Sequence, residues 1–282
     1  MKTSVLLLVF AALSLPSWAQ HGSCCMALGE EAHANFANNA ADPAFAAMHE
    51  TPRPVPTPVG GEMISFTTPD GQTAKAYFVA SPKRTNRYLI VVHEWWGLND
   101  NVKREAETWR EKLSEVNVIA VDLYDGTVAT TREAAGAAMQ GLNAERAANI
   151  LKGAIAYAGP DAVFATIGWC MGGGWSHQAS LLAGARAKAC AIYYGSPELD
   201  VERLKQEQFA PVIFIWPTKD QWINEKLVKG FEGAMTQAGK SLVVKSYEAD
   251  HAFANPSSQS YLEAASQQAN AAVLAFFQTH FR

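Results

Sequence analysis

One stretch decides the fold: Val163-Phe164-Ala165-Thr166-Ile167-Gly168-Trp169-Cys170-Met171-Gly172-Gly173-Gly174. An apolar, β-branched run ends at Gly168, the pattern Gly-x-Cys-x-Gly follows, and a helix-compatible segment begins near Trp175. This order predicts a strand, a tight turn and a helix, the arrangement called a nucleophile elbow, with cysteine in the position that serine more often occupies. The tight turn strains the backbone and leaves no room for bulk, which explains the glycines on either side. Gly-x-Cys-x-Gly alone is a weak pattern, so a buried cysteine beside a packing turn is the alternative.

Strand-like and helix-like segments alternate on both sides of this stretch. Apolar runs of strand length are typical of a parallel sheet with helices on both faces, an α/β fold. A turn signal at 69–72 predicts a hairpin before them. The predicted strands cover 63–67, 74–80, 88–93, 118–123, 163–168, 189–194, 212–216 and 242–247. The predicted helices cover 99–113, 131–140, 144–157, a segment from about 175, a short piece within 198–207, 224–238 and 257–279.

The chain has 282 residues, of which 49% are hydrophobic and 18% are charged, a composition typical of a globular protein. A net charge of −4 without any basic cluster gives no support for nucleic acid as a partner. The first 19 residues have the pattern of a secretory signal peptide: a positive Lys2, an apolar run, and Ser17-Trp18-Ala19 as cleavage site. That run, about a dozen residues long, is too short to span a bilayer. We therefore expect a periplasmic or secreted protein cleaved after Ala19.

Residues 20–58 show no convincing strand or amphipathic helix and end in a proline series from Thr51 to Pro58, which indicates a flexible extension. The adjacent Cys24 and Cys25, with histidines and methionines nearby, suggest soft-metal binding, but no recognised ligand spacing is present. These cysteines could pair with Cys190 or with another chain, and the sequence leaves this open. The domain that follows is predicted to cover 59–282.

A cysteine nucleophile needs a base, and the base needs an acid that orients it. In hydrolases with a nucleophile elbow the chain order is nucleophile, acid, histidine. His251 is the histidine in a loop directly after a late strand, and Asp220 follows the strand 212–216. Asp250 is the competing acid, but neighbours in an extended loop rarely face each other. We therefore predict Cys170, Asp220 and His251 as the catalytic residues.

Glu94 directly follows the buried strand 88–93, on the loop that commonly supplies oxyanion-hole amides. A carboxylate near a thiol raises the pKa of that thiol, and it could also accept the thiol proton. The backbone N–H groups of Trp95 and Met171 are predicted to form the oxyanion hole. The aromatic residues predicted to line the substrate site are Trp96, Tyr124 and Phe253.

Taken together, the chain from about Met63 onward resembles the dienelactone hydrolase family of the α/β-hydrolase superfamily. The resemblance depends on segments in a fixed order: 92–97, 122–124, 168–173, 193–195, Asp220 and 251–254. It implies an α/β-hydrolase fold, a triad of Cys170, Asp220 and His251, and a Glu94 that holds and then activates the thiol. It also implies hydrolysis of small cyclic esters, typically carboxymethylenebutenolide.

Two positions depart from the family pattern. The family carries an arginine just after the segment 122–124, where Asp125 and Gly126 stand here, and a second one after the catalytic histidine, where Asn255 stands. Those arginines bind a substrate carboxylate, a task that suits a guanidinium group. We therefore expect hydrolysis of a different, neutral ester or lactone.

The predicted activity is hydrolysis of a small-molecule ester or lactone through a thioester, with no metal or organic cofactor, and a monomer is favoured. Two other interpretations remain at this stage. One is a non-catalytic binding protein on a hydrolase fold. The other is a thiol-handling or metal-handling protein that acts through Cys24 and Cys25, although no Cys-x-x-Cys is present.

Overall fold

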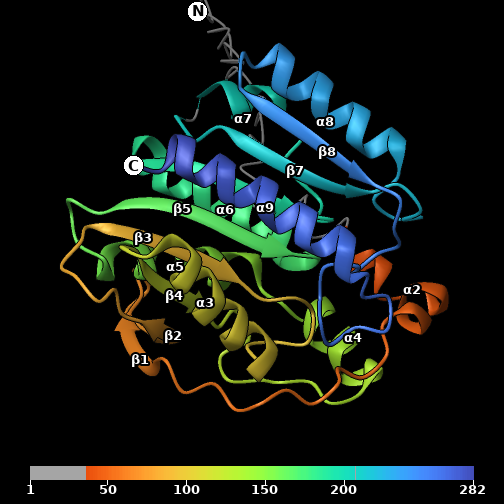
Figure 1. Ribbon diagram of the computed structural model, residues 1–282, viewed down its shortest axis with the longest axis horizontal. Helices are drawn as coiled ribbons and strands as arrows, with labels where there is room; N and C mark the ends of the chain where they lie inside the picture. The colour runs from red at the N-terminus through yellow and green to blue at the C-terminus, as the bar shows by residue number, and fades with distance from the viewer. Residues whose placement is uncertain (1–35, 207) are drawn as a thin grey trace, which may run out of the picture.

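An eight-stranded sheet forms the centre of the molecule (Figure 1). The computed structural model describes residues 36–206 and 208–282. The strand order is β1-β2-β4-β3-β5-β6-β7-β8; β2 runs antiparallel to both β1 and β4, and every other pairing is parallel. The predicted α/β fold with a mostly parallel sheet is therefore confirmed, and so is the hairpin at its edge.

The helices and strands alternate along the chain as the apolar runs indicated. The strands are β1 (Glu62–Thr67), β2 (Thr73–Val79), β3 (Arg87–Val92), β4 (Asn117–Val121), β5 (Val163–Trp169), β6 (Ala187–Tyr193), β7 (Val212–Pro217) and β8 (Leu242–Tyr247). The helices are α2 (Pro43–Met48), α3 (Asp100–Leu113), α4 (Arg132–Gln140), α5 (Ala144–Tyr157), α6 (Met171–Ala183), α7 (Val201–Gln206), α8 (Glu225–Gln237) and α9 (Glu263–His280), with a 3₁₀ turn at Gly184–Arg186.

Helices cover both faces of the sheet, so the central strands β3 to β7 are buried on both sides. On one face α3 and α9 lie side by side, with the rings of Trp109 and Phe277 5.7 Å apart. On the other face Phe231 of α8 lies 5.5 Å from the ring of His177 in α6 and 5.7 Å from Phe214 in β7. Burial on both sides explains why these strands read as continuous apolar runs in the sequence.

Two expectations about helices were wrong. The last helix begins at Glu263 and not at Ser257 or Ser258, because the Ser257 hydroxyl and amide both donate to Asn255 Oδ1 and hold the chain in a turn. The extension also contains a helix that was not predicted, α2, which Asp42 caps by accepting a hydrogen bond from the Ala44 N–H. Asp42 at the N-cap and Pro43 at the first helical position are a common pattern at the start of a helix. This pattern is easily overlooked because alanine, asparagine and proline dominate the segment.

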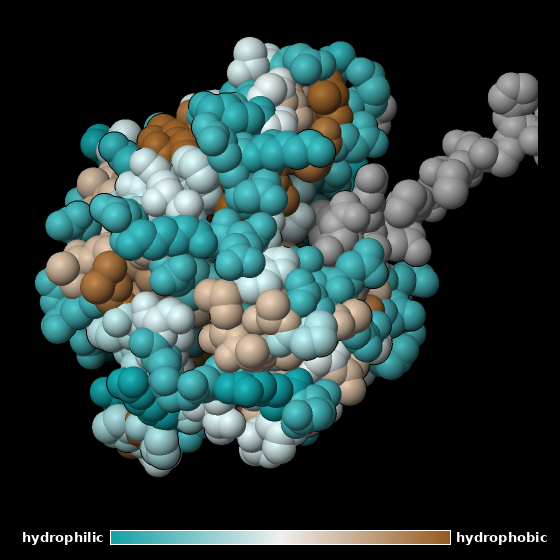
Figure 2. Space-filling view, turned by 90° about the vertical axis from the view of Figure 1, so that its right-hand side faces the viewer, coloured by the Kyte–Doolittle hydropathy of each residue, from teal (hydrophilic) through white to brown (hydrophobic). Residues whose placement is uncertain are grey.

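No helix in the described part of the chain is long and apolar enough to cross a membrane. Figure 2 views the end of the molecule at which α2 lies and shows a mainly hydrophilic surface with a few scattered hydrophobic patches. The expected signal peptide and the cysteines at 24 and 25 lie outside the described residues.

Candidate active site

Cys170 occupies the predicted elbow between β5 and α6. Its φ of 56° and ψ of −126° are strained for a residue with a side chain, and the residue is completely buried. A Cβ atom on Gly168 would lie 2.0 Å from the carbonyl oxygen of Gly172, and one on Gly172 would lie 2.3 Å from the carbonyl oxygen of His93. These contacts show why neither position tolerates a side chain.

Asp220 and His251 form a buried hydrogen-bonded pair above the carboxyl ends of the strands. The distance from Nδ1 of His251 to Oδ2 of Asp220 is 2.6 Å. The other oxygen of Asp220 accepts from the backbone N–H groups of Trp222 and Ile223, at 2.9 and 3.0 Å, so the carboxylate is fixed in place. Nε2 of His251 has no hydrogen-bond partner among the described residues, which leaves it free to face the thiol.

The thiol of Cys170 and the His251 ring affect each other's ionisation. Burial raises the pKa of Cys170, and the nearby Glu94 carboxylate adds to this, while His251 and the Met171 amide act against it. Burial alone would lower the pKa of His251, but the Asp220 carboxylate and the thiolate form of Cys170 raise it well above its usual value. The Asp220 carboxylate therefore increases the proton affinity of the His251 ring, which favours transfer of the thiol proton to it.

Glu94 lies two residues after the end of β3 and is buried. Burial raises the pKa of its carboxyl group to about 7, although His251 and hydrogen bonds from Asn255 and Tyr194 favour the charged form. Asn255 Nδ2 donates to Oε2 at 2.5 Å, and the Tyr194 hydroxyl lies 3.5 Å from Oε1. Among the described residues the carboxylate forms no hydrogen bond to the thiol; it acts on Cys170 through its charge.

The two amides predicted for an oxyanion hole lie on the loop after β3 and at the start of α6. The Trp95 N–H has no hydrogen-bond acceptor within residues 36–206 and 208–282. The Met171 N–H is directed at the Cys170 sulfur, and its hydrogen bond lowers the pKa of that thiol. The Met171 N–H thus donates to the sulfur, while the Trp95 N–H has no acceptor in the described chain.

A residue that the sequence did not single out, His49, lies directly against the thiol. Its Nε2 is 4.0 Å from Sγ of Cys170, and its Nδ1 lies 2.7 Å from the backbone oxygen of Phe45. Burial, followed by the charge of His251, lowers the pKa of His49 to about 3, so the ring is neutral. We call residues 36–49 the N-terminal cover, because they close the site over Cys170. Only the Asp42-Pro43 start signal pointed to any structure here.

The predicted substrate-lining residues separate into different environments. Trp96 lines a small cavity next to Glu94, together with Glu105, Trp169 and Asn255. Its volume of about 20 Å³ holds roughly one water molecule. Cys170 and His251 do not line it and are themselves buried, so an ester reaches the thiol only if the site opens.

The other two aromatic residues predicted to line the substrate site lie elsewhere. Tyr124 is buried beside the elbow, with its hydroxyl 3.2 Å from Sδ of Met171. Phe253 does not line this cavity; it is completely buried in the core, with its ring 5.8 Å from that of Tyr194 and 5.5 Å from that of Tyr247.

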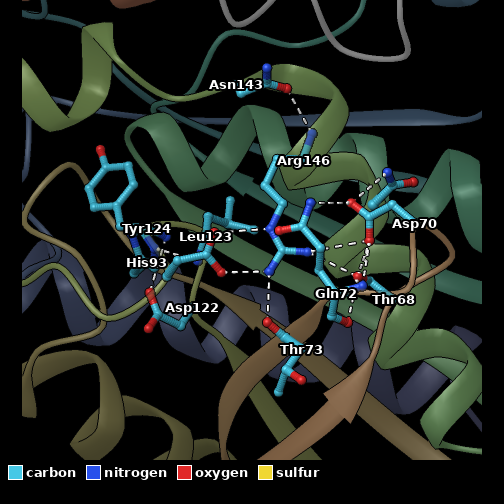
Figure 3. Close-up of polar contacts among 12 residues, drawn as sticks. Thr68, Asp70, Gln72, Thr73, His93, Asp122, Leu123, Tyr124, Asn143 and Arg146 are labelled. Atoms are coloured by element: carbon cyan, nitrogen blue, oxygen red, sulfur yellow. Dashed lines mark hydrogen bonds and ion pairs between the residues drawn. The ribbon is translucent and has the colours of Figure 1, made fainter.

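Arg146 of α5 fixes the loop that carries Tyr124. Figure 3 shows its guanidinium between the β1–β2 turn and the loop after β4. It donates to both carboxylate oxygens of Asp125, at 2.9 and 2.7 Å, and to Thr68 and the backbone of Thr73, both at 2.9 Å. In this chain the guanidinium therefore binds an internal carboxylate beside the site.

The buried histidines His93 and His177 have structural roles. His93 accepts from the Leu123 N–H at 3.1 Å and lies 2.6 Å from the Glu94 carbonyl oxygen, which joins the loops after β3 and β4. His177 accepts from the Glu198 N–H at 3.1 Å. Cys190 is a buried free thiol 3.7 Å from the Ser176 hydroxyl.

Comparison with known proteins agrees with this architecture. "Protein usf" of Aquifex pyrophilus is 29% identical over 209 residues, which cover 69% of this chain and 87% of that protein. "Carboxymethylenebutenolidase 1" of Cupriavidus pinatubonensis is 26% identical and covers 75% of this chain and 94% of that protein.

Solved structures share the fold at lower sequence identity. A dienelactone hydrolase-like promiscuous phosphotriesterase from metagenomic libraries has a TM-score of 0.66 at 17% identity, covering 79% of this chain and 99% of that one. The thermophilic esterase Est2 of Thermogutta terrifontis has a TM-score of 0.55 at 17% identity, covering 80% and 95%. The sequence model of the dienelactone hydrolase family matches residues 75–281, a stretch that begins after the N-terminal cover. With this match over most of its length, the chain belongs to the dienelactone hydrolase family.

Proposed function

We propose that this dienelactone hydrolase-family protein cleaves a small, uncharged ester or lactone, with Cys170 as nucleophile, His251 as base and Asp220 as the acid that orients it. The observation that carries the proposal is the buried Asp220–His251 pair at 2.6 Å, whose free Nε2 lies next to a thiol on a strained elbow. Nucleophile, base and orienting acid in this arrangement are the requirements of acyl transfer.

The reaction follows from the protonation states of these groups. The thiol proton moves to Nε2 of His251 as sulfur attacks the substrate carbonyl carbon. The negative charge that forms on the carbonyl oxygen is stabilised by the N–H groups of Trp95 and Met171. Collapse breaks the ester bond, the leaving alkoxide takes the proton from His251, and a thioester remains on Cys170.

Water then completes the cycle. His251 removes a proton from water, which attacks the thioester carbonyl and releases the carboxylic acid while the thiol is restored. Glu94 favours the protonated thiol before substrate binds, because a nearby negative charge and burial both disfavour a thiolate. This arrangement limits side reactions of the thiolate between turnovers.

We infer that the small cavity beside Glu94, which Cys170 and His251 do not line, receives part of the substrate, and its lining favours uncharged substrates. Neither Arg nor Lys is among the residues that line it, whereas Glu94 and Glu105 are. Asn255, at the position where the family pattern has its second arginine, donates to Glu94. A carboxylate on the substrate would meet two acidic side chains and no cationic partner, which costs affinity.

Trapping the thioester tests the nucleophile. Incubation with an aryl ester, followed by acid quench and peptide mass analysis, is expected to show the acyl mass on the Cys170 peptide. Cys170→Ala should lose both the adduct and hydrolysis. Cys190→Ala, which removes the other buried thiol of the described chain, is the matched control and should keep both. Full hydrolysis by Cys170→Ala would refute the proposal.

We also propose that the protein is exported, on the basis of the signal-peptide pattern in residues 1–19. Expression of the full chain in a bacterial host, followed by fractionation and N-terminal sequencing, should give a periplasmic or secreted product that begins at Gln20. An uncleaved product retained in the cytoplasm would contradict this part of the proposal.

A further inference from the structure

We propose that His49, Cys170 and His251 form a binding site for a transition-metal ion of the zinc type, through which the N-terminal cover is fastened over the thiol. One ligand atom from each of the three residues lies within 4.8 Å of the other two. All three side chains are buried, at 5%, 0% and 1% exposure. Two imidazoles and a thiolate are typical zinc ligands.

Both rings are oriented as metal-binding histidines usually are. Such a histidine commonly uses one ring nitrogen to contact a carboxylate or a backbone carbonyl and binds the ion with the other. Nδ1 of His251 contacts the Asp220 carboxylate at 2.6 Å, and Nδ1 of His49 contacts the Phe45 carbonyl oxygen at 2.7 Å. In each ring this leaves Nε2 for the ion, and Nε2 of His251 has no other partner within the described chain.

The distances between the three ligand atoms are slightly longer than those around a bound zinc ion. Zn–N bonds of about 2.0 Å and a Zn–S bond of about 2.3 Å place tetrahedral ligands about 3.5 Å apart. Nε2 of His49 is already 4.0 Å from Sγ of Cys170, and the rings of His49 and His251 have centroids 5.0 Å apart. Side-chain movements of about an ångström or less would complete the site, with water as a fourth ligand.

Binding has a chemical consequence at the thiol. The Cys170 thiol releases its proton to solvent as the sulfur binds the ion, and the ion occupies Nε2 of His251, the base. Hydrolysis therefore stops until the ion leaves. The inhibition depends on the proposed function, whereas binding itself does not. The ion also joins the N-terminal cover, through His49, to two residues of the hydrolase body.

The site extends beyond what the family match contains. Residues 75–281 match the family, so the ligand supplied by His49 comes from a segment outside that match. Within residues 20–58 alone, the spacing of histidines and cysteines matches no recognised metal site. The fold instead brings His49 to Cys170 and His251 across 121 and 202 positions of the chain.

The test uses the full chain with Cys24→Ser and Cys25→Ser, so that the N-terminal thiols cannot bind the added ion. The reduced, chelator-treated protein is titrated with Co²⁺, which gives a sulfur-to-cobalt charge-transfer band in the near ultraviolet when a thiolate binds it. Zn²⁺ is then used to displace Co²⁺. We expect one ion per chain, a band that Zn²⁺ abolishes, and a melting temperature that Zn²⁺ raises.

Two variants make the result specific. His49→Gln should abolish the band and the melting shift and weaken Zn²⁺ binding by about 100-fold or more, since one of three ligands is lost. His280→Gln, which alters an exposed histidine of α9, should behave as the parent. Circular dichroism shows whether each variant is folded.

The outcomes separate the two proposals. No band in the parent, or an unchanged band and Zn²⁺ affinity in folded His49→Gln, would overturn the metal site. A normal band with undiminished ester hydrolysis in saturating Zn²⁺ would keep the site and count against Cys170 as the nucleophile.

Discussion

Phe45→Ala is expected to open the N-terminal cover and expose the catalytic thiol. The ring of Phe45 is completely buried and is the main anchor of α2 on the hydrolase body. It contacts five aromatic rings with centroid distances of 4.3 to 5.8 Å, those of Phe36, His49, Trp95, Trp222 and His251. Truncation of a buried phenylalanine costs about 3 to 5 kcal/mol.

The lost free energy destabilises the closed position of the cover and not the whole fold, because the cover lies outside the sheet and the helices that pack on it. A cost of about 3 kcal/mol, at about 1.4 kcal/mol per factor of ten, makes the open form about 100-fold more populated. Alkylation of Cys170 by iodoacetamide should accelerate by about this factor. The value of kcat/KM should rise with it, because ester enters only the open form.

Mass analysis of the Cys170 and Cys190 peptides during a timed reaction measures this effect. Cys190 is a buried thiol within β6 that forms no hydrogen bond to the cover in the described chain, so it serves as the internal control and its alkylation rate should not change. Ala47→Ser, an exposed position on the same helix, is the control substitution. A Cys170 rate within a factor of two of the parent, in a folded Phe45→Ala, would refute the cover as the barrier to the thiol.

Three further predictions follow from contacts around the site. Because burial raises the pKa of Glu94 from 4.5 to about 7, the folded protein keeps a proton that the unfolded chain releases. This contribution to stability is complete below about pH 4.5 and is lost as the pH rises through 7, a change of about 3 kcal/mol. Urea unfolding at pH 5 and pH 8 should show a smaller pH dependence in Glu94→Gln than in the parent or in exposed Glu62→Gln; equal slopes would contradict it. Arg146→Lys loses the paired contact to Asp125 and should lower the free energy of unfolding by about 1 kcal/mol in the same assay, with no change counting against the network. Asn255→Arg should raise the ratio of kcat/KM for a carboxylated lactone to that for a neutral one by about tenfold, and an unchanged ratio would remove the argument from the cavity lining.

Much of the fold could be predicted because its signals are local. The strand leading to Cys170 is an apolar run, and the turn needs glycine for steric reasons. A Cβ atom on Gly168 or Gly172 would lie 2.0 or 2.3 Å from a backbone oxygen, as that reasoning required. The last helix was placed too early because serines resemble N-caps in sequence. In the structure the Ser257 hydroxyl donates to Asn255 instead. This hydrogen bond depends on the conformation of the loop around His251.

The site was only partly predictable for a related reason. Chain order placed Asp220 and His251, since both follow strands whose carboxyl ends share one edge of the sheet. Nothing in the sequence linked Asn255 to Glu94, because a hydrogen bond across 161 positions has no local signature. Phe253 was expected to line the substrate site; its ring is completely buried and packs against those of Tyr194 and Tyr247.

By itself the sequence determined which strands are buried on both faces, the elbow at Cys170 and the resemblance to the dienelactone hydrolase family. These features arise from hydrophobic runs and steric limits that act over a few residues. Only the tertiary structure placed His49 against the thiol at 4.0 Å and closed the site beneath α2. A six-residue helix among alanines has little preference of its own, and what holds it is the packing of Phe45 against rings from distant parts of the chain.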